Sequence, residues 1–165
     1  MKIKRLEKSD FISFYEMQKE LDNETKFMMY EPGERPTGKE NFDSMIEWFE
    51  KSNSCMLVVF DKEKMVGVIA AERGNFRRTR HVAYISIAVL SNYRNQGIGS
   101  RLFWEIEKWA KSNEIKRLEL TVMCHNENAI KLYKKAGFEI EGKKIHGMKI
   151  DGEYIDEYYM AKILG

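Results

Sequence analysis

The chain of 165 residues has few of the features that mark specialised protein classes. It has only two cysteines, Cys55 and Cys124, far apart and without a Cys-x-x-Cys pair, so neither a disulfide framework nor a cysteine metal site is indicated. No apolar run approaches the length of a membrane span, and residues 1–8 lack the apolar core of a signal peptide. We therefore expect a protein of the reducing cytoplasm that has no membrane partner.

The sequence also lacks a strong charge of either sign. Its 28 basic and 26 acidic side chains are interleaved and give a net charge of +2, which argues against a nucleic-acid partner. The densest basic cluster, Arg73 to Arg80, is expected to be a solvated loop, with guidance of an anionic cofactor as the alternative. The three histidines, His81, His125 and His146, lack metal-ligand spacing, so no metal is expected.

Hydrophobic periodicity predicts one domain, residues 1–165, with an α/β (α+β) fold around a central mixed sheet. The sheet is expected to be mixed because both hairpins and helical crossovers occur. The expected strands cover residues 2–6, 55–60, 65–71, 81–90, 116–123, 138–145 and 154–163. The expected helices cover residues 11–23, 39–51, a segment beginning at 98, and a segment from Asn126 or Asn128 to Lys135. Residues 146–152 are rich in turn formers and are expected to form a loop.

The most informative stretch is Arg94-Asn-Gln-Gly97-Ile-Gly99-Ser100, which follows a β-branched run and opens a helical pattern. The first N–H groups of a helix have no intrahelical partner and lie at the positive end of its dipole. Glycines let a phosphate approach such backbone closely, so residues 94–100 are predicted to be a pyrophosphate-binding turn, the phosphate cradle. Ser100-Arg101-Leu102 supplies neither the lysine of a P-loop nor the third glycine of a dinucleotide-binding turn.

Arg94-x-x-Gly97-x-Gly99 at such a turn resembles the signature of the GNAT superfamily, the N-acetyltransferases that use acetyl-coenzyme A (acetyl-CoA). A second segment, 118–138, resembles the later GNAT motif, with a strand, Asn126, a helix carrying Tyr133, and Gly137-Phe138. The resemblance covers about residues 55–164, the expected acetyl-CoA-binding core. Residues 1–54 match no motif and fit the variable substrate-side helices of the family.

The resemblance implies a GNAT-like domain with a mostly antiparallel, twisted sheet of about seven strands flanked by about four helices. It implies acetyl-CoA as the acetyl donor, and no metal. The residues that it assigns to cofactor binding are Ile87, Ala88, Val89, Arg94, Asn95, Gln96, Gly97, Ile98, Gly99, Ser100, Asn126 and Tyr133.

Acetyl transfer to a primary amine by direct attack in a ternary complex requires proton transfers. By resemblance, a backbone N–H near Val89 binds the oxyanion, and Tyr133 protonates the departing thiolate as general acid. An ammonium of pKa about 10.4 must first lose a proton. Some relatives use a glutamate at the position that Thr121 occupies here. Glu72 is the first candidate base, and the alternatives are Glu31, Glu119 or a chain of waters.

The acceptor is left open by the sequence. The apolar stretch 26–34 contains Glu31 and Glu34, which could attract an ammonium, and residues 146–153 could form the opposite wall. A peptide N-terminus, an amino acid, a polyamine and an amine antibiotic all fit. The alternatives to an enzyme are a non-catalytic acetyl-CoA sensor and an interaction module that dimerises through the late strands. A homodimer is also compatible with catalysis.

Overall fold

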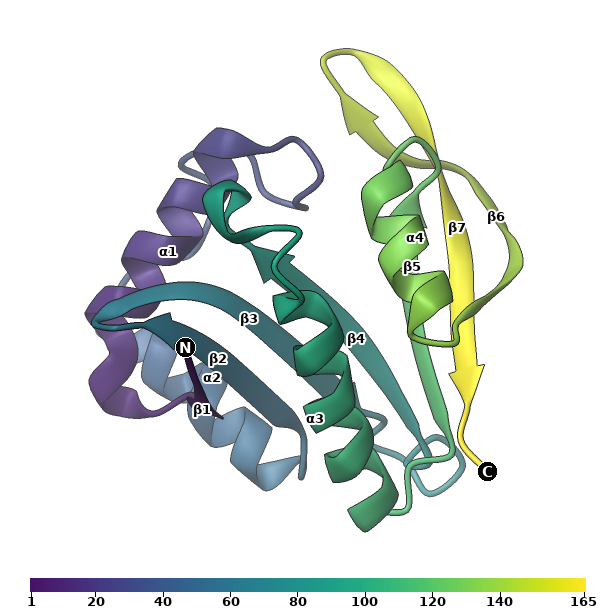
Figure 1. The fold of residues 1–165 in the computed structure, drawn as a ribbon, viewed down its shortest axis with the longest axis horizontal. Coiled ribbons are helices and arrows are strands. Elements are labelled where there is room, and N and C mark those ends of the chain that lie inside the picture. The colour runs from purple at the N-terminus through teal and green to yellow at the C-terminus, as the bar shows by residue number, and fades with distance from the viewer.

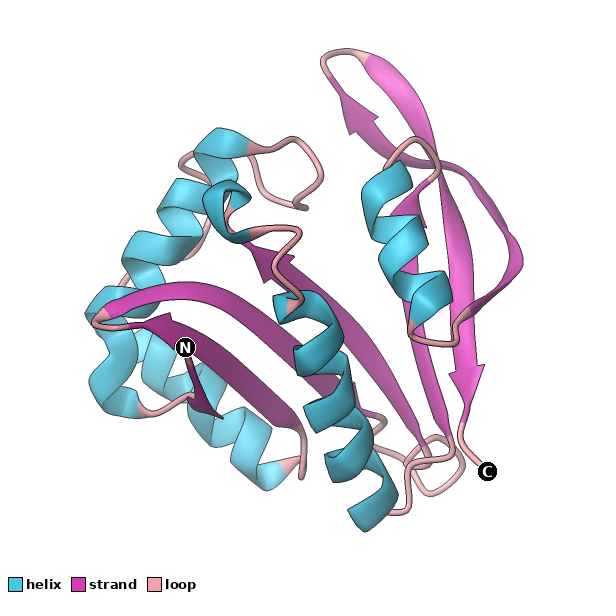
Figure 2. Cartoon of the chain, viewed as in Figure 1, coloured by secondary structure: helices cyan, strands magenta, loops and turns pink.

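A seven-stranded sheet with the order β1-β2-β3-β4-β5-β7-β6 forms the centre of the computed structural model, which describes residues 1–165 (Figures 1 and 2). The strands are β1 (Lys2–Arg5), β2 (Cys55–Asp61), β3 (Lys64–Arg73), β4 (Val82–Val89), β5 (Arg117–Met123), β6 (Glu139–Ile150) and β7 (Glu153–Ile163). Every neighbouring pair is antiparallel except β4 and β5, which are parallel. The exception follows from the connection, because a helical crossover rather than a hairpin joins these two strands.

Four helices cover the two faces of the sheet. They are α1 (Phe11–Glu24), α2 (Lys39–Lys51), α3 (Ile98–Ser112) and α4 (Glu127–Lys135), with short 3-10 turns η1 (Lys8–Asp10) and η2 (Ser91–Tyr93). In Figure 1, α3 and α4 lie in front of the sheet and α2 lies behind it. Helix α1 packs on α2, because the rings of Phe11 and Phe14 each lie 5.4 Å from that of Phe42. None of these helices combines the length and the apolar character needed to cross a bilayer.

The mixed sheet flanked by four helices confirms the fold class expected from the sequence. The helices and the sheet share one hydrophobic core. A single cluster of 30 buried apolar residues includes Met17 and Leu21 of α1, Ile69 of β3, and Leu102 and Ile106 of α3. In α3 the buried residues recur at Leu102, Ile106 and Ala110, which places them on one side of the helix.

The expected loop at residues 146–152 is wrong. Strand β6 continues to Ile150, and only Asp151 and Gly152, both with positive φ (50° and 84°), form the hairpin turn. The pairing register of β6 with β7 shifts between Lys144 and Met148, and His146 within this interval has a φ of 54°. Turn-forming residues therefore mark a bulge inside a strand here, which the sequence pattern alone does not distinguish from a loop.

The parallel pairing of β4 with β5 is short, and this creates the opening on which the site depends. Only Val82, Ala83 and Tyr84 pair, with Arg117, Leu118 and Glu119. Beyond Tyr84 the two strands separate, with α3 beside one and α4 beside the other (Figure 1).

Candidate active site

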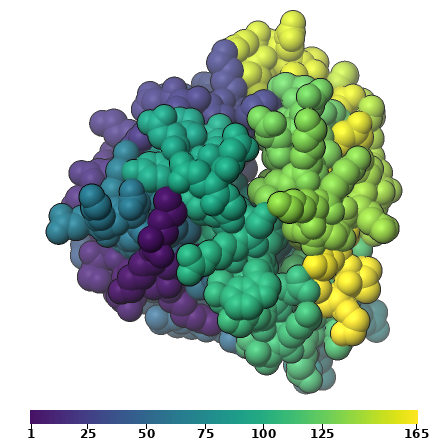
Figure 3. All heavy atoms as spheres, in the orientation of Figure 1, coloured from purple at the N-terminus to yellow at the C-terminus, as the bar shows by residue number.

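A groove of about 1830 Å³ passes through the opening between β4 and β5. Its lining comes from the cradle, α4, both diverging strands and the segment between α1 and α2. Figure 3 shows a hollow at this place, between the teal surface that precedes α3 and the green surface of α4. Small-molecule sites usually measure about 300–1,000 Å³, so this groove has room for two ligands end to end.

The phosphate cradle presents a run of unpaired backbone donors. The first hydrogen bond of α3 runs from the Arg101 N–H to the Gly97 carbonyl, over 3.0 Å, so the N–H groups of residues 95–100 have no helical acceptor. Asn95 and Gly97 have left-handed φ values of 59° and 78°, which turn the chain into the helix. Arg94, Lys131 and Lys135 add positive charge to the groove lining. Donors and charge together suit a pyrophosphate.

Glu24, at the end of α1, holds the chain that leads into the cradle. Its carboxylate accepts hydrogen bonds from the Ser91 N–H (2.7 Å) and hydroxyl (2.8 Å), and lies 3.4 Å from Nη2 of Arg94. Arg94 also donates from Nε to the Val89 carbonyl, at 2.9 Å. Sequence analysis missed Glu24, because 67 residues separate it from Ser91 and no local pattern links them.

The two cradle glycines serve different purposes. A Cβ at Gly97 would touch nothing within 4 Å, so its left-handed backbone explains this glycine. A Cβ at Gly99 would lie 2.8 Å from Cδ2 of Leu132, so this glycine allows α3 to approach α4 closely. Phosphate approach at Gly99 stays a prediction, and packing against Leu132 is a second reason for a glycine there.

Gly99→Ala should lower the free energy of unfolding by roughly 1 kcal/mol, the low end for overpacking, because Leu132 meets the new methyl group with a flexible end. Urea denaturation would measure the loss. In the double variant Gly99→Ala/Leu132→Ala, the cost of the alanine at 99 should largely vanish. Equal costs with and without Leu132 would contradict a packing role for Gly99.

Backbone groups of β4 line the opening. The Gly74 N–H bonds the Val82 carbonyl and the Leu90 N–H bonds the Val66 carbonyl, both at 3.0 Å, so the even-numbered residues of β4 are hydrogen-bonded to β3. The odd-numbered residues therefore direct their backbone groups toward β5. Since pairing with β5 ends at Tyr84, the N–H groups of Ile87 and Val89 have no strand partner. Ala88 faces β3 with its backbone and reaches the groove with its side chain.

Tyr133 of α4 reaches the groove from a buried position. Its side chain is 8% exposed and packs against Phe103 and Phe138, with ring centroids 5.8 and 6.2 Å away. Burial, and to a lesser degree the neighbouring Tyr84, raise the pKa of the Tyr133 phenol well above its ordinary value. The phenol therefore stays protonated and can donate a proton.

Tyr84 bridges the two diverging strands. Its hydroxyl lies 2.8 Å from Oγ1 of Thr121 on β5, and Glu72 of β3 is its cross-strand partner. Partial burial raises the pKa of the Glu72 carboxyl, although much of the side chain remains exposed, and no ion pair compensates its charge. Sequence analysis missed Tyr84, although its alternation with Ser86 and Ala88 would have placed it on the same face.

The other candidate bases lie elsewhere. Glu119 accepts from Nε of Arg117 at 2.7 Å and does not line the groove. Neither Glu31 nor Glu34 lines the groove, and the Glu34 carboxylate accepts from the Glu31 N–H at 2.8 Å.

Sequence analysis missed Glu157 of β7, which is 7% exposed, lines the groove and lies 3.8 Å from Nζ of Lys144.

Two predicted cofactor residues also have local roles. Asn126 lines the groove and caps α4, because its Oδ1 accepts from the Ala129 N–H at 3.4 Å. Gln96 turns away, since its amide donates to the Asn92 carbonyl at 3.0 Å and its side chain is absent from the groove lining. Only the Gln96 backbone can contribute to the cradle. The remaining predicted cofactor residues, including Ile98 and Ser100, line one continuous groove.

Comparisons with known proteins agree with this geometry. The family model for the GNAT acetyltransferases matches residues 14–138. The chain belongs to the GNAT family. A solved GNAT acetyltransferase from Streptococcus pneumoniae shares 30% sequence identity, covers 99% of both chains and has a TM-score of 0.93. This confirms the resemblance read from the sequence.

One curated protein and one further solved structure are also similar to this GNAT chain. The L-amino acid N-acetyltransferase AaaT of Escherichia coli is 40% identical over 103 residues, which cover 60% of this chain and 62% of that protein. The chain thus spans less than two thirds of this curated relative. A phosphinothricin acetyltransferase from Sinorhizobium meliloti, solved in complex with acetyl-CoA, has a TM-score of 0.87 at 20% identity and covers 99% of this chain and 88% of its own. At that identity it shows a shared fold.

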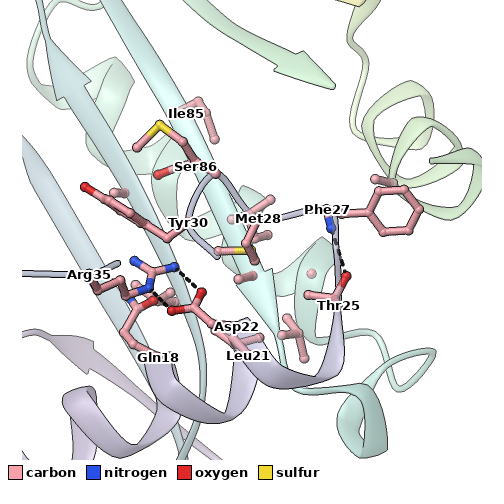
Figure 4. A pocket seen from close by; sticks show the side chains of 18 of the residues that line it. Gln18, Leu21, Asp22, Thr25, Phe27, Met28, Tyr30, Arg35, Ile85 and Ser86 are labelled. Atoms are coloured by element: carbon pink, nitrogen blue, oxygen red, sulfur yellow. Dashed lines mark hydrogen bonds and ion pairs between the residues drawn. The ribbon is translucent and has the colours of Figure 1, made fainter. Parts of the chain in front are cut away.

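The segment between α1 and α2, residues 25–38, covers one end of the groove in this GNAT domain. Its Phe27 ring lies 5.2 Å from the His125 ring, and its Lys26 forms an ion pair with Asp151 at the β6–β7 turn. Both contacts reach the half of the molecule that carries α4. Figure 4 shows Phe27 directed away from Tyr30 and Arg35, which face the other part of the pocket.

Proposed function

We propose that this protein is an N-acetyltransferase that moves the acetyl group of acetyl-CoA to a primary amine by direct attack in a ternary complex. The observation that carries the proposal is one continuous groove with unpaired donors at residues 95–100 and, further along, the unpaired N–H groups of Ile87 and Val89, with Tyr133 in the lining of the same groove. Acetyl-CoA supplies an acetyl group on a thioester, whose sulfur is a good leaving group. These features fit its pyrophosphate, its acyl oxygen and its sulfur in turn.

Each residue has a stated role in this proposal. The cradle and Asn126 bind and orient the cofactor, and the N–H of Val89 or Ile87 donates to the acyl oxygen as negative charge develops there. Glu72 accepts a proton from the acceptor ammonium, directly or through a water, so that the nitrogen can bond the acyl carbon. As the carbon–sulfur bond breaks, the Tyr133 hydroxyl gives its proton to the sulfur. The nitrogen loses its second proton as the tetrahedral intermediate collapses, and this proton returns to the Tyr133 oxygen, so that one proton leaves through Glu72 in each turnover.

The two parts of the chain serve the two substrates. Residues 55–164 supply the cradle, Tyr133 and the opening, and act as the acetyl-CoA-binding core. Residues 1–54 supply the acceptor side, because the segment between α1 and α2 roofs that end. The exposed apolar side chains of the β6–β7 hairpin, Ile145, Tyr154 and Ile163, favour a homodimer through this edge. We expect the protein to act in the cytoplasm on a small-molecule or peptide amine.

Calorimetric titration with acetyl-CoA, followed by a panel of amines with a free-thiol readout, tests the proposal. The E. coli relative is named for action on L-amino acids, so these come first in the panel, before polyamines and peptides. We expect micromolar binding and thiol release with one amine class. Binding without release from any amine would favour the sensor alternative. No binding would contradict the cradle on which the proposal rests.

A further inference from the structure

Arg35 lies in the wall of the groove on the acceptor side and is held by one edge only. Its Nε and Nη2 donate to the two carboxylate oxygens of Asp22, at 2.6 and 3.0 Å (Figure 4). Asp22 is 6% exposed, so the ion pair lies on the buried side of α1. A guanidinium has five N–H donors, and this arrangement occupies two of them.

The geometry around Arg35 fixes its orientation further. The guanidinium carbon lies 4.7 Å from the ring centroid of Tyr30, so the ring covers one face. The Nη1 edge, opposite Asp22, has no partner within the protein, although Arg35 lines the groove. A planar guanidinium held rigidly on one edge is well prepared to donate to a second carboxylate on the other.

Apart from Arg35, the lining of this part of the groove suits an apolar ligand that carries one hydrogen-bond donor. Met28, Leu21 and Tyr30 line this part of the groove, and Figure 4 shows them with Gln18 and Ser86 around the same space. The Oε1 atom of Gln18 is buried and has no hydrogen-bond partner, which is costly unless a ligand donates to it. These observations describe a site that a carboxylate and an amine donor on one small molecule would complete.

Resting on the proposed function, we propose that Arg35 binds the carboxylate of the acceptor, and that the acceptor is an amino acid with an apolar side chain. Asp22 already neutralises the guanidinium, and an amino acid enters as a neutral zwitterion, so the groove takes up no uncompensated charge. The alternative is that Asp22 and Arg35 only fasten residues 25–38 to α1.

Matched substrates separate these two roles. L-Leucine and 3-methylbutylamine carry the same side chain and differ in the carboxylate. The wild-type protein should use leucine with a KM about 10- to 100-fold lower, since a charge-assisted hydrogen bond is lost with the amine. Arg35→Gln should raise the KM for leucine by about the same factor and change that for 3-methylbutylamine less than about threefold.

A second variant guards against unfolding, because Arg35→Gln leaves Asp22 as a buried charge without its partner. Asp22→Asn/Arg35→Gln removes both charges and should show the same loss of preference for leucine with a thermal midpoint closer to that of the wild type. Equal losses for both substrates in this double variant would overturn the proposal and support a fastening role. A wild-type protein that acetylates 3-methylbutylamine as well as leucine would also overturn it, while leaving the proposed function intact. Failure to acetylate any amine, despite acetyl-CoA binding, would instead contradict the proposed function itself and with it the carboxylate site.

Discussion

Tyr133→Phe should lower kcat by about 10²- to 10⁴-fold, the usual contribution of a general acid, while acetyl-CoA affinity changes by less than about threefold. The change removes one hydroxyl and keeps the ring that packs against Phe103 and Phe138, so the core is preserved. Because burial raises the pKa of this phenol, the proton donor persists at alkaline pH. The wild-type rate should therefore not decline up to about pH 10, the ordinary phenol pKa. Steady-state kinetics over this range and calorimetry with acetyl-CoA would measure both quantities.

Tyr84→Phe is the matched control for Tyr133→Phe, since it removes the same hydroxyl from the other phenol in the opening. Its expected loss is a hydrogen bond to Thr121, worth roughly 1 kcal/mol of stability, with a smaller fall in kcat. A larger loss of kcat in Tyr84→Phe than in Tyr133→Phe would assign the proton donor to Tyr84 instead.

Local sequence spacing predicted the parts of the site that are contiguous in the chain. The cradle could be read from Arg94, Gly97 and Gly99, because a strand, a glycine turn and a helix start follow within a dozen residues. The cap Asn126 and the phenol of Tyr133 could be read from one helix in the same way. The seven strands were found because each has a clear apolar pattern, even where its ends were misplaced.

The remaining parts depend on contacts between distant segments, which periodicity does not encode. Glu24 reaches Ser91, and Tyr84 reaches Thr121, only because the sheet order brings those elements together. Arg35 and Asp22 flank a segment with no clear hydrophobic period, so their pairing across the end of α1 left no signal. At His146 the same residue types that form loops form a bulge, and only pairing with β7 decides between them.

Glu72→Gln should lower kcat/KM by about 10²- to 10³-fold near neutral pH, where the acceptor is almost entirely an ammonium and needs a base. Burial raises the pKa of the Glu72 carboxyl, so the ionised base is lost as pH falls through a range above that of ordinary carboxyls. As pH is lowered, the kcat/KM of the wild-type protein should therefore begin to fall at a higher pH than it would with a fully exposed glutamate as the base. The deficit of the variant should shrink as pH approaches the pKa of the amine, because a free amine needs no base.

Stability separates this catalytic loss from unfolding. A folded-state pKa raised by burial means that the ionised Glu72 is disfavoured by folding, so its stability cost develops as pH rises from the ordinary carboxyl pKa to the raised one and is complete above it. Glu72→Gln should thus keep or slightly raise the thermal midpoint at pH 8 while it loses activity. Glu157→Gln makes the same chemical change at another glutamate of the groove, which has Lys144 beside it. If Glu157→Gln abolished turnover and Glu72→Gln left it unchanged, the base would be Glu157, and the acceptor amine would lie on the β7 side of the opening rather than beside β3.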